Sequence, residues 1–149
     1  MKSITCFVSV AILLMSACGV SPSSTARMQF LSAQVTVTGA QAAGLAADLQ
    51  AAGITRRLAD MNMAFVFVDK IACVESAASA GNPVCVLSWP EGESTVQGPQ
   101  AQRFFALLSA HGALHGSAHS GAVNAEAAQV RCVFVQPARD PATCSFRVN

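Results

Sequence analysis

The sequence predicts an α+β fold in which one antiparallel six-stranded sheet, or two small sheets, carries two helices on one face. The chain has 149 residues, of which 52% are hydrophobic and 11% charged, a composition typical of a folded domain and not of a disordered chain. Its later cysteines recur at a fixed interval, and each cysteine pair follows a predicted helix. These observations together indicate two tandem copies of one β-α-β-β unit.

The N-terminus resembles an export signal. An apolar run at residues 5–17 follows Met1 and Lys2, and it is shorter than the roughly 20 residues that a membrane-spanning helix needs. The run ends in the sequence MSAC at Cys18, which resembles the lipobox of bacterial lipoproteins, although Met15 stands where Leu is usual. The resemblance implies that Cys18 receives fatty acid such as palmitate and becomes the mature N-terminus.

The same resemblance implies a location in the cell envelope. Gly19 after the lipidated cysteine is typical of sorting to the outer membrane, facing the periplasm. We therefore expect a lipoprotein signal peptide at 1–17, a lipidated cysteine and tether at 18–27, and a single domain at 28–149. An ordinary cleaved signal peptide and a transmembrane anchor are the alternatives.

The domain contains an internal repeat. Cys132 and Cys144 lie 59 residues after Cys73 and Cys85, and the same shift aligns TVTGAQA at 36–42 with TVQGPQA at 95–101. Without a gap, 13 of the 55 aligned positions are identical. We therefore expect two copies of one unit, at about 34–89 and 94–149.

The first copy begins with a β-rich stretch at 34–38. A helix follows, in which Leu45 and Leu49 share one face and after which Gly53 ends the helix. Two strands complete the copy, at about 64–75 and 84–89.

The second copy repeats this order from a β-rich stretch at 94–97. Its helix has Pro99 in the first turn, Phe104 and Leu108 on one face, and Gly112 at its end. The two strands that follow are predicted at about 129–136 and 143–148.

Four cysteines remain in the exported domain, and an even number indicates disulfides. The pairs Cys73–Cys85 and Cys132–Cys144 would each join the two strands of a hairpin, whereas neither has the short spacing of a zinc site. Because side chains alternate along a strand, the cysteine-bearing face is the apolar one, and we expect it to pack under the helices. That face comprises Ile71, Cys73, Cys85 and Leu87 in copy one, and Val130, Cys132, Phe134, Cys144 and Phe146 in copy two.

Three histidines, His111, His115 and His119, are spaced by four residues after the second helix. Imidazole is a common metal ligand, so this loop, with Glu126 nearby, is a candidate site for Zn or Cu. The glycines among the histidines weaken a helix, and the alternatives are a solvated loop or a catalytic histidine.

The opposite sheet face of copy one is a candidate partner surface, because an exposed apolar face commonly marks an interface. Copy two carries Arg131 and Arg147 on its matching hairpin, and the alternative is that residues 28–31 cover the apolar face. The candidate surface comprises Val66, Val68, Val74, Val84 and Val86.

The function class follows from what the sequence contains. A net charge of +1 and the lack of a basic run argue against nucleic-acid binding. No nucleophile elbow, phosphate loop or dinucleotide motif is present, so we expect no enzyme activity. The sequence favours a non-catalytic, lipid-anchored module that binds an envelope protein or a cell-wall partner; the alternative is a periplasmic transition-metal-binding protein that uses the histidine loop.

Overall fold

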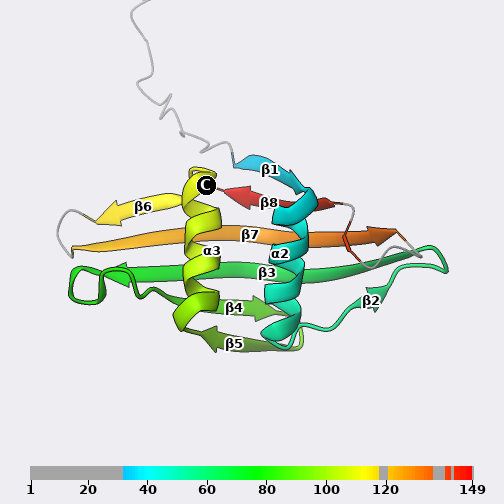
Figure 1. Cartoon of the computed structure of the whole chain (residues 1–149), viewed down its shortest axis with the longest axis horizontal. Helices are drawn as coiled ribbons and strands as arrows, with labels where there is room; N and C mark the ends of the chain where they lie inside the picture. The colour runs from blue at the N-terminus through cyan, green and yellow to red at the C-terminus, as the bar shows by residue number, and fades with distance from the viewer. Residues whose placement is uncertain (1–31, 118–120, 136–139, 142, 149) are drawn as a thin grey trace, which may run out of the picture. The chain divides into compact units, whose positions relative to one another are not determined.

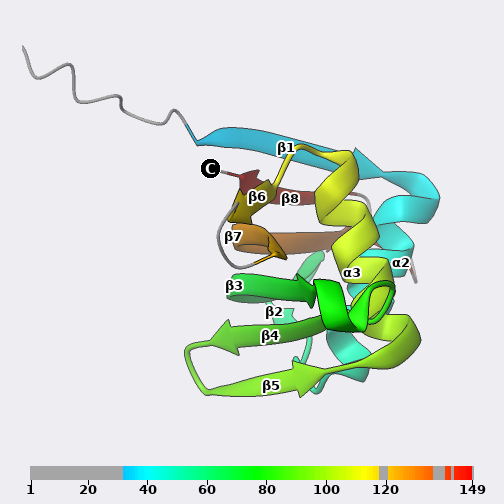
Figure 2. The same ribbon diagram turned by 90° about the vertical axis from the view of Figure 1, so that its left-hand side faces the viewer.

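The strands form one antiparallel sheet, and two helices lie side by side across one of its faces (Figure 1; Figure 2). The computed structural model describes residues 32–117, 121–135, 140–141 and 143–148. The predicted signal peptide, Cys18, the tether and His119 lie outside the described residues. Within the described part of the chain, the structure has the α+β class that the sequence predicts.

The two halves of the chain contain matching series of elements. The first half runs β1 (Ala33–Thr38), α2 (Gly39–Ala51), β2 (Arg57–Leu58), β3 (Met63–Ser76), a short 3₁₀ helix η2 (Ala77–Ser79) and β4 (Val84–Trp89). The second runs β5 (Gly92–Val96), α3 (Gly98–Ala110), β6 (Leu114–Ser117), β7 (Ala122–Val135) and β8 (Thr143–Val148).

The sheet is larger than the sequence predicts. It has eight strands, because the short strands β2 and β6 pair with β3 and β7 in addition to the six expected. Strand β7 begins at Ala122, seven residues before the predicted start. Its first half is rich in alanine, which has low strand propensity, but it pairs with β3 from Lys70↔Ala128 to Ser76↔Ala122. Pairing with a long neighbour thus extends the strand where local propensity does not.

The order of the main strands interleaves the two halves. It runs β1-β8-β7-β3-β4-β5, with the long strands β3 and β7 side by side at the centre. Strand β1 pairs with β8, and β5 pairs with β4, so each half contributes an edge strand next to the hairpin of the other half. The sheet is therefore shared by both halves.

Glycines end both helices as predicted. Helix α2 ends at Ala51 and α3 at Ala110, and each is followed by a glycine with positive φ, Gly53 at 99° and Gly112 at 80°. Side chains other than glycine rarely adopt this backbone conformation, so the two positions suit a helix terminus.

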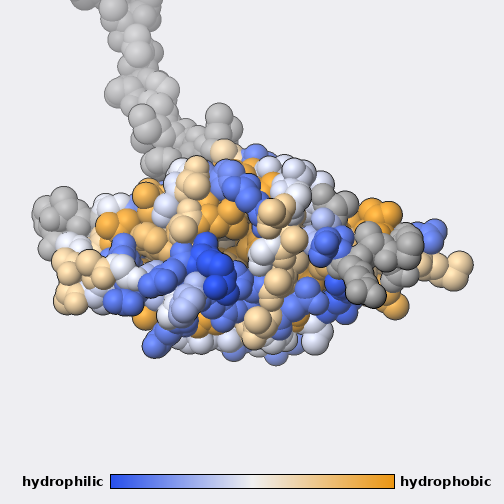
Figure 3. Space-filling model, in the orientation of Figure 1, coloured by the Kyte–Doolittle hydropathy of each residue, from blue (hydrophilic) through white to orange (hydrophobic). Residues whose placement is uncertain are grey.

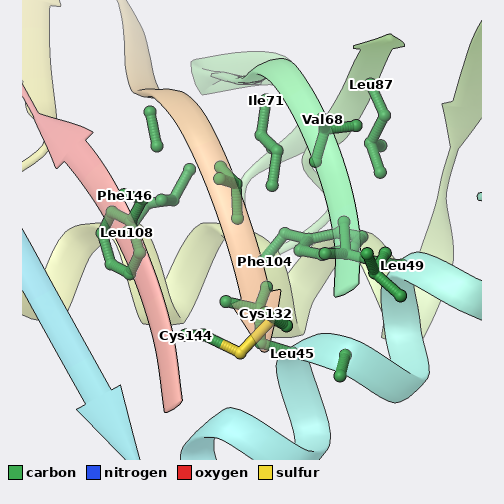
Figure 4. Close-up of a cluster of buried hydrophobic side chains, with 14 of the residues drawn as sticks. Leu45, Leu49, Val68, Ile71, Leu87, Phe104, Leu108, Cys132, Cys144 and Phe146 are labelled. Carbon is green, nitrogen blue, oxygen red and sulfur yellow. A yellow bond between two sulfur atoms is a disulfide. The ribbon is translucent and has the colours of Figure 1, made fainter. Parts of the chain in front are cut away.

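The core fills the space between the helices and the sheet (Figure 4). Leu45 and Leu49 from α2 and Phe104 and Leu108 from α3 are buried, as their helical spacing predicts. The cysteine-bearing faces of both hairpins are buried too, with every predicted member at most 1% exposed. The core is thus one continuous layer.

Each hairpin contains a disulfide, in the pairing that the spacing favours. Cys73 is bonded to Cys85 and Cys132 to Cys144, and in both hairpins the two residues lie directly opposite each other. Both disulfides are fully buried and form part of the core.

In both central strands, the alternation of buried and exposed residues shifts by one position halfway along. In β3, Val66 and Val68 are fully buried, Asp69 and Lys70 are both exposed, and Ile71 is buried again. Two successive exposed residues break the alternation, which is typical of a β-bulge. The prediction that Val66 and Val68 belong to the outer apolar face is therefore wrong: before the bulge these two valines point toward the helices.

Strand β7 has a matching irregularity next to this one. Its pairing with β8 shifts by one residue between Ala128 and Arg131, and Gln129 has a φ of 52°. Up to Ala127 the buried residues of β7 are odd-numbered, and from Val130 onward they are even-numbered. The two bulges lie side by side in the sheet, so the alternation of buried residues shifts at the same level in both central strands.

Candidate functional site

The face of the sheet opposite the helices is a candidate binding surface. Both helices lie on the other face, and no described element covers this one (Figure 2). The helix-bearing face is mixed in character, with its most hydrophilic region between α2 and α3 (Figure 3). We refer to the uncovered side as the outer face.

Four apolar side chains form a patch on the outer face, where β3 runs beside β4. Ala72 lies opposite Val86, and Val74 lies opposite Val84. The exposed fraction is 45% for Val74 and 38% for Val84, whereas Ala72 and Val86 are half-buried. We call these four residues the valine patch.

The valine patch has a polar border. Lys70 pairs with Glu126 across β3 and β7, with 3.0 Å between Nζ and Oε2, and Thr95 lies opposite Val86 on the edge strand β5. The corresponding positions of the second half carry Arg131, Val133, Thr143 and Ser145. Only one of these four positions, Val133, is apolar, so the second half does not repeat the valine patch.

A cavity opens on the outer face beside the bulge of β7. Its volume is about 240 Å³, and we call it the arginine pocket. Arg131 lies opposite Ser145 on β8 and Phe67 on β3, while Arg147 lies opposite Gln34 on β1. The lining residues are Gln34, Phe67, Gln129, Arg131, Ser145, Phe146 and Arg147.

Neither arginine of this pocket forms an ion pair with any carboxylate among the residues that the structure describes. The guanidinium of Arg131 lies 4.7 Å from the centre of the Phe65 ring, a cation–π arrangement that leaves its N–H groups available. Strand alternation predicts both arginines on the outer face, but no sequence pattern indicates the pocket, because its lining comes from four strands that only the fold brings together.

A second cavity of about 240 Å³ lies where β2 and β4 leave a gap along β3. Trp89 and Phe67 line it together with the loop after α2, and Arg57 forms an ion pair with Glu91 at its border. Trp89 also packs against the hydrophobic core. Trp89 is half-buried, so one part of its ring is in the core and another part lines the cavity.

The histidines that the structure describes do not lie together. His111 follows α3 and contacts the buried ring of Phe146, with ring centroids 5.8 Å apart. His115 is exposed in β6 and lies opposite Asn124, whose neighbour Ala125 is buried under the helices. Paired residues share a face, so His115 lies on the outer face and His111 on the helix side.

This separation weakens the metal hypothesis. The segment from 114 to 117 is a strand, not a loop or helix, so the spacing of four residues does not bring His111 and His115 to one ion. Among the described residues, no group of three or more His, Cys, Asp or Glu side chains is placed to hold a metal, and His119 lies outside this range.

One charged contact links the two helices. Asp48 of α2 is 7% exposed and accepts two hydrogen bonds from Arg103 of α3, at 2.8 Å from Nε and 2.5 Å from Nη2. The hydrogen bonds and the negative charge of Asp48 raise the pKa of Arg103 above its ordinary value. The pair holds the helices together, and it lies on the side of the sheet away from the outer face.

The chain matches no known family model, and comparison with curated proteins and solved structures gave no significant match. No helix in the described part of the chain is long and apolar enough to cross a membrane.

Proposed function

We propose that this protein is a non-catalytic, lipid-anchored bacterial envelope protein that binds a partner protein through the valine patch. The observation that carries this proposal is the exposure of Val74 and Val84, directly opposite each other on an uncovered sheet face. Clustered apolar side chains on the surface gain free energy when a partner removes them from water.

The shape of the valine patch favours a protein as the partner. Small ligands bind in concave sites, and none of the cavities described above is lined by Val74, Val84 or Val86. An exposed region of two neighbouring strands can be covered by a broad apolar surface of a protein. A cell-wall polymer, rich in hydroxyl and amide groups, has less to gain from contact with valines.

The proposed anchor is Cys18, acylated after removal of residues 1–17, and the proposed location is the outer membrane, facing the periplasm. The two buried disulfides support an oxidising compartment, since such bonds persist in exported proteins and are rare in the cytosol. The lipid would hold the domain at the membrane and leave its sheet available to envelope proteins.

We also infer that the domain arose by duplication of one β-α-β-β unit. The shift of 59 residues that aligns the sequences also relates the helices α2 and α3, the long strands β3 and β7, and the two disulfides. In this interpretation, the copies diverged on the outer face, where one kept apolar side chains and the other acquired arginines.

Site-specific photo-crosslinking in intact cells tests the partner proposal. A benzophenone amino acid replaces Val84 in the full chain, and the matched control places the same probe at Ala47, which is exposed on α2. We expect a discrete adduct with one envelope protein from the Val84 position, and none from Ala47. Adding Val74→Asp should remove the adduct, because a charge in the patch opposes apolar contact, while leaving the fold intact.

Three results would overturn the proposal. The first is the same adducts from both positions, which would indicate random contact. The second is an adduct with residues 28–31 of the same chain, which would mean that the protein covers its own patch. The third is an adduct with peptidoglycan in place of a protein.

A further inference from the structure

We infer that the arginine pocket is a binding site for an organic anion, a ligand with a carboxylate or phosphate head on an apolar body. This inference goes beyond the proposed function and does not depend on it, because the pocket is separate from the valine patch. It rests on the charge of the pocket, the geometry of its donors and the form of the backbone beside it.

The charge of the pocket is positive and is not neutralised within the described chain. Arg131 and Arg147 both line it, and neither forms an ion pair with a described carboxylate. Asp69 is exposed in the facing bulge of β3 but does not line the cavity, and Lys70 is paired with Glu126. Two guanidinium groups at one cavity repel each other, and an anion between them would reverse this cost.

The donors converge from neighbouring strands. Arg131 of β7 lies opposite Ser145 of β8. Arg147 lies two residues after Ser145 on β8 and on the same face, so the two arginines are diagonal neighbours. Residues in this relation normally have Cα atoms about 7–8 Å apart, within reach of one bound group for side chains as long as arginine. Gln34 and Ser145 add an amide and a hydroxyl to the same cavity.

The fork of a guanidinium group matches the oxygens of a carboxylate or phosphate, and hydrogen bonds between charged groups are stronger than neutral ones. The remaining wall of the cavity includes Phe67, which is half-buried and offers an apolar surface. An oxyanion with an apolar body would therefore satisfy both parts of the pocket.

The backbone beside the pocket is strained. Gln129 has a φ of 52°, and it is the one described residue other than glycine with positive φ. A bulge of this kind turns side chains away from regular alternation, and strained backbone is frequent at binding sites. Here the bulge places Gln129 at the border of the cavity.

Calorimetric titration of the full chain in detergent micelles tests the inference, with empty micelles as the blank. The probes are benzoate, phenyl phosphate and benzamide, which is a neutral relative of benzoate. We expect saturable binding of at least one acid probe, and binding of benzamide about tenfold weaker or less, because benzamide lacks the charge. The preferred acid identifies the head group of the ligand.

Variants then assign the binding to the two arginines. Arg131→Gln and Arg147→Gln should each weaken the acid probe by about fivefold or more, and Arg147→Lys should lie between, since lysine keeps the charge without the fork. The control Arg103→Gln removes the same charge from the opposite side of the sheet and should leave the affinity unchanged. Circular dichroism verifies that each variant is folded.

The inference is overturned by equal binding of benzoate and benzamide, or by the absence of saturable binding for both acids. It is also overturned if Arg103→Gln weakens binding as much as the pocket variants, because the effect would then come from net charge alone.

Discussion

The sulfur of Cys144 lies 3.4 Å from the carbonyl oxygen of Ala42, although 102 positions separate the two residues in the chain. Cys144 belongs to the second hairpin and Ala42 to the helix of the first half. The equivalent contact joins Cys85 and Ala101, at 3.5 Å. Each hairpin disulfide therefore packs beneath the helix of the other half, and the two halves share one core.

This interlocking predicts a single unfolding transition, even when one disulfide is removed. Replacing both Cys132 and Cys144 by alanine should lower the free energy of unfolding by about 3 kcal/mol, because the bond closes a short loop in the unfolded chain. Urea unfolding followed by Trp89 fluorescence, which reports on the first half, should coincide with unfolding followed by circular dichroism.

The matched control replaces Cys73 and Cys85, which have the same sequence separation of 12 residues. This double replacement should lower the free energy of unfolding by a similar amount. Two separate transitions in either variant would show that the halves fold independently and would contradict the interlocked core.

The bulge in β3 predicts different costs for two valines of the same strand. Val68→Ala should lower the free energy of unfolding by about 2 kcal/mol, because Val68 is fully buried. Val74→Ala should lower it by less than about 1 kcal/mol, because Val74 is 45% exposed. Urea titration of both variants measures the difference, and equal costs would mean that the strand does not change face.

The sequence was sufficient to predict the features set by local pattern. Helical spacing identified the buried faces of both helices, and the repeated cysteine interval identified the pairing of Cys73 with Cys85 and Cys132 with Cys144. Alternation gave the correct buried face wherever a strand is regular, as at Ile71 and Val130.

Features that depend on strand neighbours could not be predicted in this way. A bulge shifts alternation by one residue without a sequence signal as strong as glycine, and this shift misplaced Val66 and Val68. The arginine pocket depends on the order β1-β8-β7-β3, because it combines residues from four strands. The pairing of β1 with β8 joins the two ends of the domain, and no local pattern encodes it.

The contact between Asp48 and Arg103 predicts a link between the helices that salt weakens. Asp48→Asn should lower the melting temperature by a few degrees, since it leaves the guanidinium without its charged partner. The difference from the unmodified chain should shrink at high salt, which screens charges. Arg103→Lys should be intermediate, and a difference that salt does not affect would argue against an electrostatic role.

The proposed lipid anchor makes Cys18 the residue that retains the protein at the membrane. Cys18→Ser should abolish labelling by a fatty-acid probe and should release the protein into the soluble periplasm or block its processing. Cys6→Ser is the control, because Cys6 lies within the predicted signal peptide and should have no effect on labelling. A Cys18→Ser chain that still takes up label and stays at the membrane would exclude this anchor.

The left-handed backbone at Gln129 predicts an unusual response to substitution. Gln129→Gly should leave the free energy of unfolding unchanged or raise it by up to about 1 kcal/mol, whereas Gln129→Val should lower it by about 1–2 kcal/mol, because a β-branched residue is strained at positive φ. Lys70 of β3 is the control, because it pairs regularly with Ala128 and Ser88 and its φ is not positive. There the order should reverse, with glycine costing more than valine, because glycine weakens a regular strand. Urea unfolding of the four variants compares the two positions. The same order at both would mean that the β7 bulge has another geometry and that the arginine pocket beside it has another shape.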